Sequence, residues 1–110
     1  MSKLDDLCVK YAKELEGLGE KVDAKLLRAV AKACGPSIYR ADASLVAVTD
    51  PKEVNRVKRN FCMAKLGLKD TPKTAEGIDD VKKKYNKRRK LRAVFYYLLV
   101  KRFKKASVFK

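Results

Sequence analysis

The hydrophobic pattern is densest near the C-terminus, where residues 93–100 carry only apolar and aromatic side chains. In a helix, the residues at three- and four-residue spacing would share one face, and these are Leu91, Val94, Phe95, Leu98, Leu99 and Phe103. The opposite side would carry Ala93, Tyr96, Tyr97 and Val100. A helix that is apolar all round is covered by other helices. The pattern therefore predicts a buried C-terminal helix at the centre of a bundle.

Two helices are predicted in the first third of the chain. The first spans residues 3–17, and the second begins after Asp23, a good N-cap residue, and ends at Gly35. Residues 38 and 39, an Ile and a Tyr, indicate a short helical turn that buries both side chains. Residues 45–48 are apolar and β-branched, but no second strand is predicted to pair with them. We therefore expect a buried connector there.

Two more helices are predicted between this connector and the central helix. Asp50 suits an N-cap before a proline, and Glu53 can reach back to complete a capping box. That helix ends at Gly67, and an amphipathic segment follows over residues 75–85. Nothing after it forces a break, but Asn86 begins a stretch without apolar residues. We therefore predict that the helix ends near Asn86 instead of running into the central one.

The chain is predicted to be one all-α domain, residues 1–110, built as a compact bundle of about five short helices around the buried C-terminal helix. Its hydrophobic content of 46% is that of a globular protein. Charge is distributed unevenly along it. Residues 1–50 hold eight Lys or Arg and eight Asp or Glu, whereas residues 51–110 hold twenty and five, which accounts for the net charge of +15. The basic half is expected to attract polyanions.

The strongest functional signal is a basic block within residues 82–92. Eight of these eleven residues are cationic: Lys82, Lys83, Lys84, Lys87, Arg88, Arg89, Lys90 and Arg92. A charge run of this kind is usually a solvated surface without a binding function, but this block contains no acidic residue that could offset its self-repulsion. A helix that starts after Asn86 would also place cations at its N-terminus, where the dipole disfavours them. Phosphates would relieve both penalties, so we predict a nucleic-acid-binding site with little sequence specificity.

Most enzyme chemistry is disfavoured by the composition. The chain has no His, and its five glycines are expected at helix ends instead of in a phosphate-binding loop. The carboxylate pairs lie where helix capping explains them. We therefore expect no catalytic residue, no cofactor and no metal site. The cysteines, Cys8, Cys34 and Cys62, are too far apart for a zinc or redox motif, and we predict reduced core thiols in a cytoplasmic protein. The longest uncharged run, eight residues, is too short to span a membrane.

Several strings resemble a small bacterial family of uncharacterised proteins of about this length. They are Gly35-Pro36-Ser37-Ile38-Tyr39, Ala41-Asp42-Ala43-Ser44, Asp50-Pro51, Lys65-Leu66-Gly67-Leu68, Arg92-Ala93-Val94-Phe95-Tyr96-Tyr97-Leu98-Leu99, Phe103 and Ser107-Val108-Phe109. The resemblance covers nearly the whole chain and implies a compact helical, cytoplasmic protein without assigned catalytic residues. Residues 82–92 are more basic than this family's pattern leads us to expect. We therefore attach the polyanion expectation to this chain and not to the family.

Two alternatives to a small non-enzymatic protein that binds RNA or DNA remain. One is a protein-interaction module, either a homodimer through the aromatic C-terminal helix or a subunit docked on an acidic partner. It requires that part of the aromatic helix stays exposed. The other is attachment to anionic lipid through the basic block, which would need the apolar residues that the core also needs.

Overall fold

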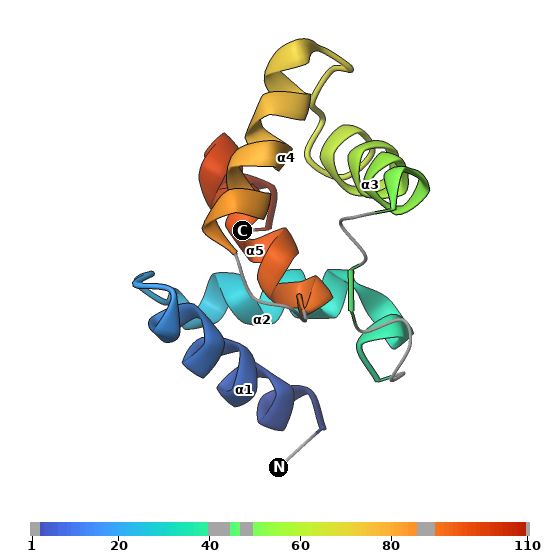
Figure 1. The fold of residues 1–110 in the computed structure, drawn as a ribbon. Coiled ribbons are helices and arrows are strands. Elements are labelled where there is room, and N and C mark those ends of the chain that lie inside the picture. Colours follow the sequence, from blue (N-terminus) through green and yellow to red (C-terminus); the bar gives the residue numbers. More distant parts are fainter. Residues whose placement is uncertain (1–2, 40–44, 47–49, 86–89, 110) are drawn as a thin grey trace.

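Five α-helices organise the part of the chain that the structure describes, residues 3–39, 45–46, 50–85 and 90–109 of a computed structural model (Figure 1). The helices are α1 (Lys3–Gly17), α2 (Ala24–Ala33), α3 (Pro51–Val57), α4 (Pro72–Lys84) and α5 (Arg92–Phe103). Three shorter helical segments are η1 (Gly35–Tyr39), η2 (Lys58–Met63) and η3 (Ala106–Phe109). The all-α prediction is confirmed.

The centre of α5 is fully enclosed. Every residue from 93 to 100 is at most 9% exposed. The surrounding contacts come from α1, α2 and α4, and Figure 1 shows α5 between α4 and the α1–α2 layer. The prediction of a buried central helix is therefore confirmed. The tyrosines and the phenylalanine in this part of α5 are therefore core residues.

The hydroxyl group of Tyr97 joins α5 to the α1–α2 layer. Tyr97 is fully buried, and its hydroxyl accepts a hydrogen bond from Asp23 N at 3.0 Å and donates one to Lys21 O at 3.1 Å. The Asp23 side chain in turn accepts from Leu26 N at 3.2 Å, which confirms its predicted role as the N-cap of α2. One phenol therefore satisfies two backbone groups in the α1–α2 connection.

The start of α3 differs from the predicted capping box. Asp50 is the N-cap and accepts a hydrogen bond from Lys52 N at 2.9 Å. Glu53 does not return to this end of the helix, because its carboxylate binds Arg92 of α5 at 2.7 Å. The predicted single helix to Gly67 also divides, since η2 continues α3 as a π-helical segment. Gly67 then has a φ of 72°, the left-handed conformation expected of a helix-ending glycine.

Two expectations about the region between α2 and α3 are corrected, one for the connector and one for the short helical turn before it. Leu45 has a strand-like partner after all, because it forms an isolated antiparallel bridge with Leu91, and Val46 N donates to Lys90 O at 2.8 Å. Leu91 is distant in sequence and lies at the start of a helix, so the sequence contained no strand pattern from which this pairing could be predicted. Ile38 is buried as predicted, but Tyr39 is 51% exposed.

The predicted break before α5 is confirmed. Helix α4 ends at Lys84, and Tyr85 leaves the helical conformation with φ −89° and ψ 74°. The Tyr85 side chain is fully buried, and its hydroxyl accepts a hydrogen bond from Leu91 N at 2.9 Å. This bond satisfies a backbone donor next to the first turn of α5. Asn86, at which the break was expected, lies outside the described residues.

Gly77 does not lie at a helix end, as the sequence suggested, but in the interior of α4. A Cβ atom added there would lie 2.4 Å from Cζ of Phe103 in α5. Real Cβ atoms do not approach other atoms so closely, so α4 can lie this near to α5 because residue 77 has no side chain.

We expect Gly77→Ala to lower the free energy of unfolding by about 1–2 kcal/mol, because the overpacking outweighs the better helix propensity of Ala. Urea denaturation measures it. In a Phe103→Leu background, the same substitution should have no cost or should stabilise, since the ring is gone. Destabilisation of equal size in both backgrounds would contradict the assigned contact.

Candidate polyanion interface

The basic block does not form a single face of one helix. Lys82, Lys83 and Lys84 make the last turn of α4, and Lys90 precedes α5. Three further members of the predicted site, Lys87, Arg88 and Arg89, lie outside the described residues. The final turn of a helix is where the macrodipole favours cations. The predicted dipole penalty therefore does not apply to the three lysines of α4.

The expected self-repulsion is also smaller than predicted for two of these lysines. Lys82 pairs with Asp79 at 3.3 Å, one turn earlier in the same helix. Lys84 pairs with Glu20, which comes from the α1–α2 connection and could not be recognised as a neighbour from the sequence. Lys83 is exposed. Acidic residues from elsewhere in the fold thus partly balance the start of the block.

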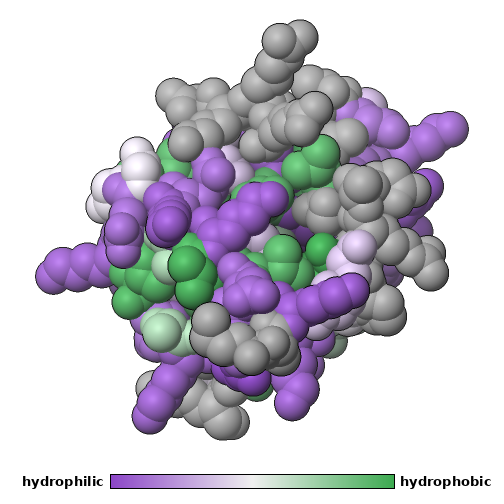
Figure 2. Space-filling model, turned by 90° about the horizontal axis from the view of Figure 1, so that it is seen from below, coloured by the Kyte–Doolittle hydropathy of each residue, from purple (hydrophilic) through white to green (hydrophobic). Residues whose placement is uncertain are grey.

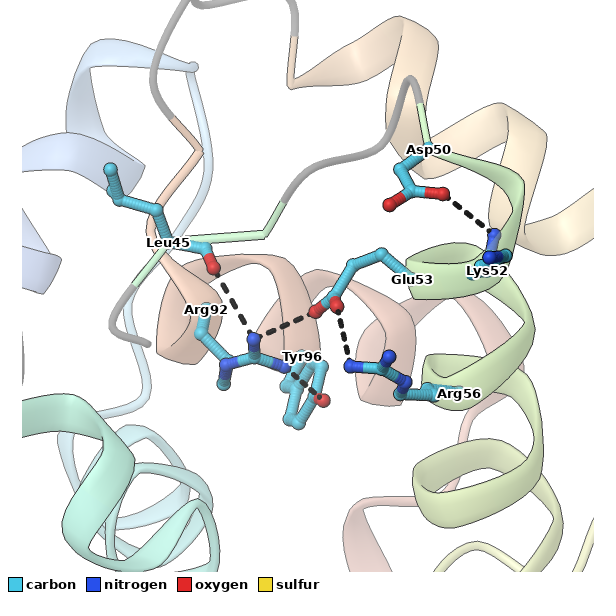
Figure 3. Close-up of polar contacts among 7 residues, drawn as sticks. All are labelled: Leu45, Asp50, Lys52, Glu53, Arg56, Arg92 and Tyr96. Carbon is cyan, nitrogen blue, oxygen red and sulfur yellow. Dashed lines mark hydrogen bonds and ion pairs between the residues drawn. The ribbon is translucent and has the colours of Figure 1, made fainter. Parts of the chain in front are cut away.

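Arg92 points into the protein instead of toward solvent (Figure 3). Its guanidinium binds Glu53 at 2.7 Å, donates to Tyr96 Oη at 2.9 Å and reaches Leu45 O at 3.3 Å. The side chains of the ion pair are only 17% and 15% exposed. Burial by itself would lower the pKa of Arg92, but the hydrogen bond that Arg92 donates to Glu53 and its contact with Tyr96 raise that pKa. Arg92 therefore ties α5 to α3, and we remove it from the predicted phosphate-binding set.

Two neighbouring hollows follow the seam between α4 and α5 and share Arg102. The first, of about 310 Å³, is bordered by Lys84, Lys101 and Arg102 over a floor that includes Val81 and Leu98. Arg102 donates two hydrogen bonds to Asp80 Oδ2, at 2.9 and 3.1 Å, across the seam. Tyr85, just after α4, contacts Leu91 at the start of α5, whereas Phe103 at the end of α5 packs on Gly77 in the middle of α4, so the two helices run antiparallel.

The second hollow, of about 620 Å³, extends the same seam toward the start of α4. Its cationic side chains are Lys69, Lys73, Arg102 and Lys104. We name the two hollows together the basic strip, defined by Lys69, Lys73, Lys84, Lys101, Arg102 and Lys104. Three acidic residues also line it, Glu20, Glu76 and Asp80, so these nine side chains sum to about +3 at neutral pH.

Most members of the basic strip were missed in the sequence analysis. Lys101, Arg102 and Lys104 lie beyond the dense block, and Lys69 and Lys73 lie in a region of mixed charge. A signal for the first three was present, because residues 81–110 hold thirteen Lys or Arg and no Asp or Glu. Nothing local indicated Lys69 and Lys73, which join the strip because α4 and α5 are antiparallel.

The exposed apolar surface is small. Among the described residues, the exposed large hydrophobic side chains are Val9, Tyr39 and Val108. Figure 2 views the molecule from the side on which α1 lies, and hydrophilic side chains project at the left, right and lower edges of that face, with hydrophobic surface between them. No helix in the described ranges is long and apolar enough to cross a membrane.

The surroundings of the three cysteines are those of packing residues and not of reactive thiols. Cys62 is fully buried, whereas Cys8 and Cys34 are half-buried. Burial raises the pKa of Cys34 and of Cys62 to about 12, which leaves little of the reactive thiolate at neutral pH. Within the described part of the chain, no group of three or more His, Cys, Asp or Glu side chains could hold a metal ion.

Comparison with known proteins identifies the family without assigning an activity. The model of a family described as "Protein of unknown function (DUF2853)" matches residues 10–107, nearly the whole chain. The predicted resemblance to a small family of uncharacterised proteins is therefore confirmed. No curated protein matches the sequence.

We expect Arg92→Lys to lower the free energy of unfolding by about 1–3 kcal/mol, because an ammonium cannot reach Glu53, Tyr96 and Leu45 together. Urea denaturation measures this. Arg56→Lys is the matched control, since Arg56 also faces Glu53 but is 70% exposed, and it should change stability by less than about 0.5 kcal/mol. If Arg92→Lys left stability unchanged and weakened binding to RNA, the phosphate-binding role predicted from the sequence would be restored.

Proposed function

We propose that this chain, which belongs to the DUF2853 family, is a non-enzymatic protein that binds the phosphate backbone of RNA or DNA with little sequence specificity. The binding surface is the basic strip together with Lys83 and residues 87–90 of the basic block. The observation that carries this proposal is the acid-free, thirteen-cation stretch of residues 81–110. Four of its cations, Lys84, Lys101, Arg102 and Lys104, lie beside Lys69 and Lys73 along the α4–α5 seam.

The size of the strip suits a nucleic-acid backbone. Helix α4 has 13 residues, so the seam along it is about 20 Å long. Over that distance one strand of a duplex presents about six phosphates. The ion pairs within the strip do not prevent binding, because Arg102 and Asp80 are each almost half exposed and such pairs contribute only about 0–1 kcal/mol. A phosphate can therefore replace Asp80 as the partner of Arg102 at small cost.

The burial of the aromatic residues supports weak sequence specificity. Tyr85, the only aromatic residue within the basic block, is fully buried, and Tyr96 and Tyr97 belong to the core. Proteins that read single-stranded bases stack them on exposed aromatic rings. Phe103 lines the second hollow but is half-buried, with its ring against Gly77 of α4. The exposed groups of the strip are therefore mainly cations, which bind the backbone and carry no sequence information. Lysines predominate in the strip, and they act as point charges instead of bidentate readers.

We expect fluorescence anisotropy with mixed RNA and DNA fragments to show binding at about 150 mM salt. The logarithm of the affinity should fall linearly with log[salt] between about 50 and 300 mM, with a slope of about −5 to −7, because about six to eight phosphates release counterions. A combined Lys83→Gln, Lys101→Gln and Lys104→Gln variant should reduce the magnitude of the slope by about one for each phosphate that is no longer neutralised. Gln substitutions over residues 87–90 should act in the same direction.

The matched control removes three exposed lysines from the other side of the bundle. Lys10→Gln, Lys13→Gln and Lys25→Gln change the net charge equally but lie on α1 and α2. An equal reduction of affinity in this control would mean that overall charge, not the proposed surface, drives binding. Absence of binding at about 150 mM salt would refute the proposal. Binding to anionic vesicles but not to nucleic acid would favour the lipid alternative.

A further inference from the structure

A second surface feature lies on α3 and the adjoining face of α4, away from the α4–α5 seam. It is a groove of about 670 Å³ between the two helices. Its apolar lining includes Val54 of α3 with Ala75 and Ile78 of α4. Lysines stand around this lining: Lys52, Lys58 and Lys82. The basic strip also has apolar residues in its floor, such as Leu98 and Phe103, but six cations border it, whereas three border this groove.

The groove exists because α3 does not pack directly along α4. The π-helical η2 makes the contacts with α4, while the first turn of α3 is held to α5 by the Glu53–Arg92 pair. Figure 1 shows α3 at the edge of the molecule, joined to α4 by the loop above them. Val54 is consequently half-buried and Ala75 is exposed, although both occupy the facing sides of the two helices. Ile78 is only 2% exposed, so the open apolar surface of the groove is that of Val54 and Ala75, which no described element covers.

The charged side chains around the groove indicate what kind of molecule binds in it. Lys52 is exposed, Lys58 pairs with Asp70 at 2.9 Å, and Lys82 pairs with Asp79 at 3.3 Å. Each of these acids is about 60% exposed, so its pairing is weak and exchangeable. A second copy of this chain is a poor occupant, because each copy carries a net charge of +15. The three lysines instead complement carboxylates on the flanks of an incoming segment.

We propose that this groove binds an amphipathic helix of a partner protein, with acidic residues flanking its apolar face. The lining residues span 51–58 on one side and 75–82 on the other, so the groove can accommodate about 12 Å, or about two turns, of helix. Apolar side chains of the partner at i, i+3, i+4 and i+7 contact Val54 and Ala75 above the buried Ile78, as in other helix-in-groove complexes. Its Asp or Glu residues meet Lys52, Lys58 and Lys82. The proposal is independent of nucleic-acid binding.

A pair of synthetic peptides tests the groove. The first is a helical peptide of about 16 residues with Leu at the i, i+3, i+4 and i+7 positions and Glu on both flanks. The second has the same composition in an order that destroys the apolar face. In two-dimensional ¹⁵N NMR titrations, the first should give saturable shifts at Val54, Ala75 and Ile78. The second should bind at least about tenfold more weakly, because it keeps the charge but cannot bury the Leu side chains.

Ala75→Arg is the decisive variant, because groove binding and simple charge attraction predict opposite results. The added side chain occupies the groove, so binding of the first peptide should weaken by about tenfold or more. If acidic peptides were attracted by charge alone, the extra cation would leave binding unchanged or strengthen it. Ala75 is exposed on a helix, so the variant should keep its fold, which circular dichroism checks. The Lys83→Gln, Lys101→Gln and Lys104→Gln variant should bind the peptide normally.

Three outcomes would overturn the proposal. One is equal affinity for the two peptides, and another is shifts confined to the basic strip around Lys101 and Lys104. The third is no saturable binding of the first peptide to the wild-type chain below about 1 mM, a threshold that corresponds to about −4 kcal/mol. Nucleic-acid binding could still hold in each of these cases, so the failure of one proposal is distinguishable from the failure of the other.

Discussion

Helix α5 can exist in water only if other elements cover every side of its apolar centre, and the fold is arranged to meet this requirement. Burying each large apolar side chain contributes about 1.5–3 kcal/mol, and residues 93–100 are all buried. The helices α1, α2 and α4 supply most of the cover, and the absent side chain of Gly77 lets α4 come close. Because this helix lies inside, the cations that follow its centre, Lys101, Arg102 and Lys104, are directed to the surface, whereas Arg92 at its start binds Glu53 within the fold.

The Glu53–Arg92 pair is the main polar connection between α3 and the core. Arg92 begins α5, and its contacts with Glu53, Tyr96 and Leu45 join three separate parts of the chain (Figure 3). This attachment fixes the first turn of α3 while η2 packs on α4, and the groove is the space left between the two helices. A cation whose neighbours in the sequence suggested phosphate binding thus has a structural role.

The two proposed surfaces use the excess of cations in different ways. Along the α4–α5 seam, Lys101, Lys104 and their neighbours place six cations around the two hollows, and this density of charge suits a phosphate backbone. Between α3 and α4, lysines surround apolar side chains such as Val54, which suits a partner that is both acidic and apolar. Lys82 lies on the border of the groove and in the basic block. A chain with both surfaces could hold a nucleic acid and an acidic protein at the same time.

The sequence by itself determined the features that depend on neighbours along the chain. Helical periodicity revealed the burial of α5, cap residues such as Asp23 located helix starts, and composition revealed the basic C-terminal half. Contacts between helices were decided only by the tertiary structure: Glu53 left its predicted capping box for Arg92, and Gly77 faced Phe103 from mid-helix. Lys69 and Lys101 joined one strip because α4 and α5 run antiparallel. Local signals act within about one turn of helix, whereas these contacts depend on which faces of distant helices pack together.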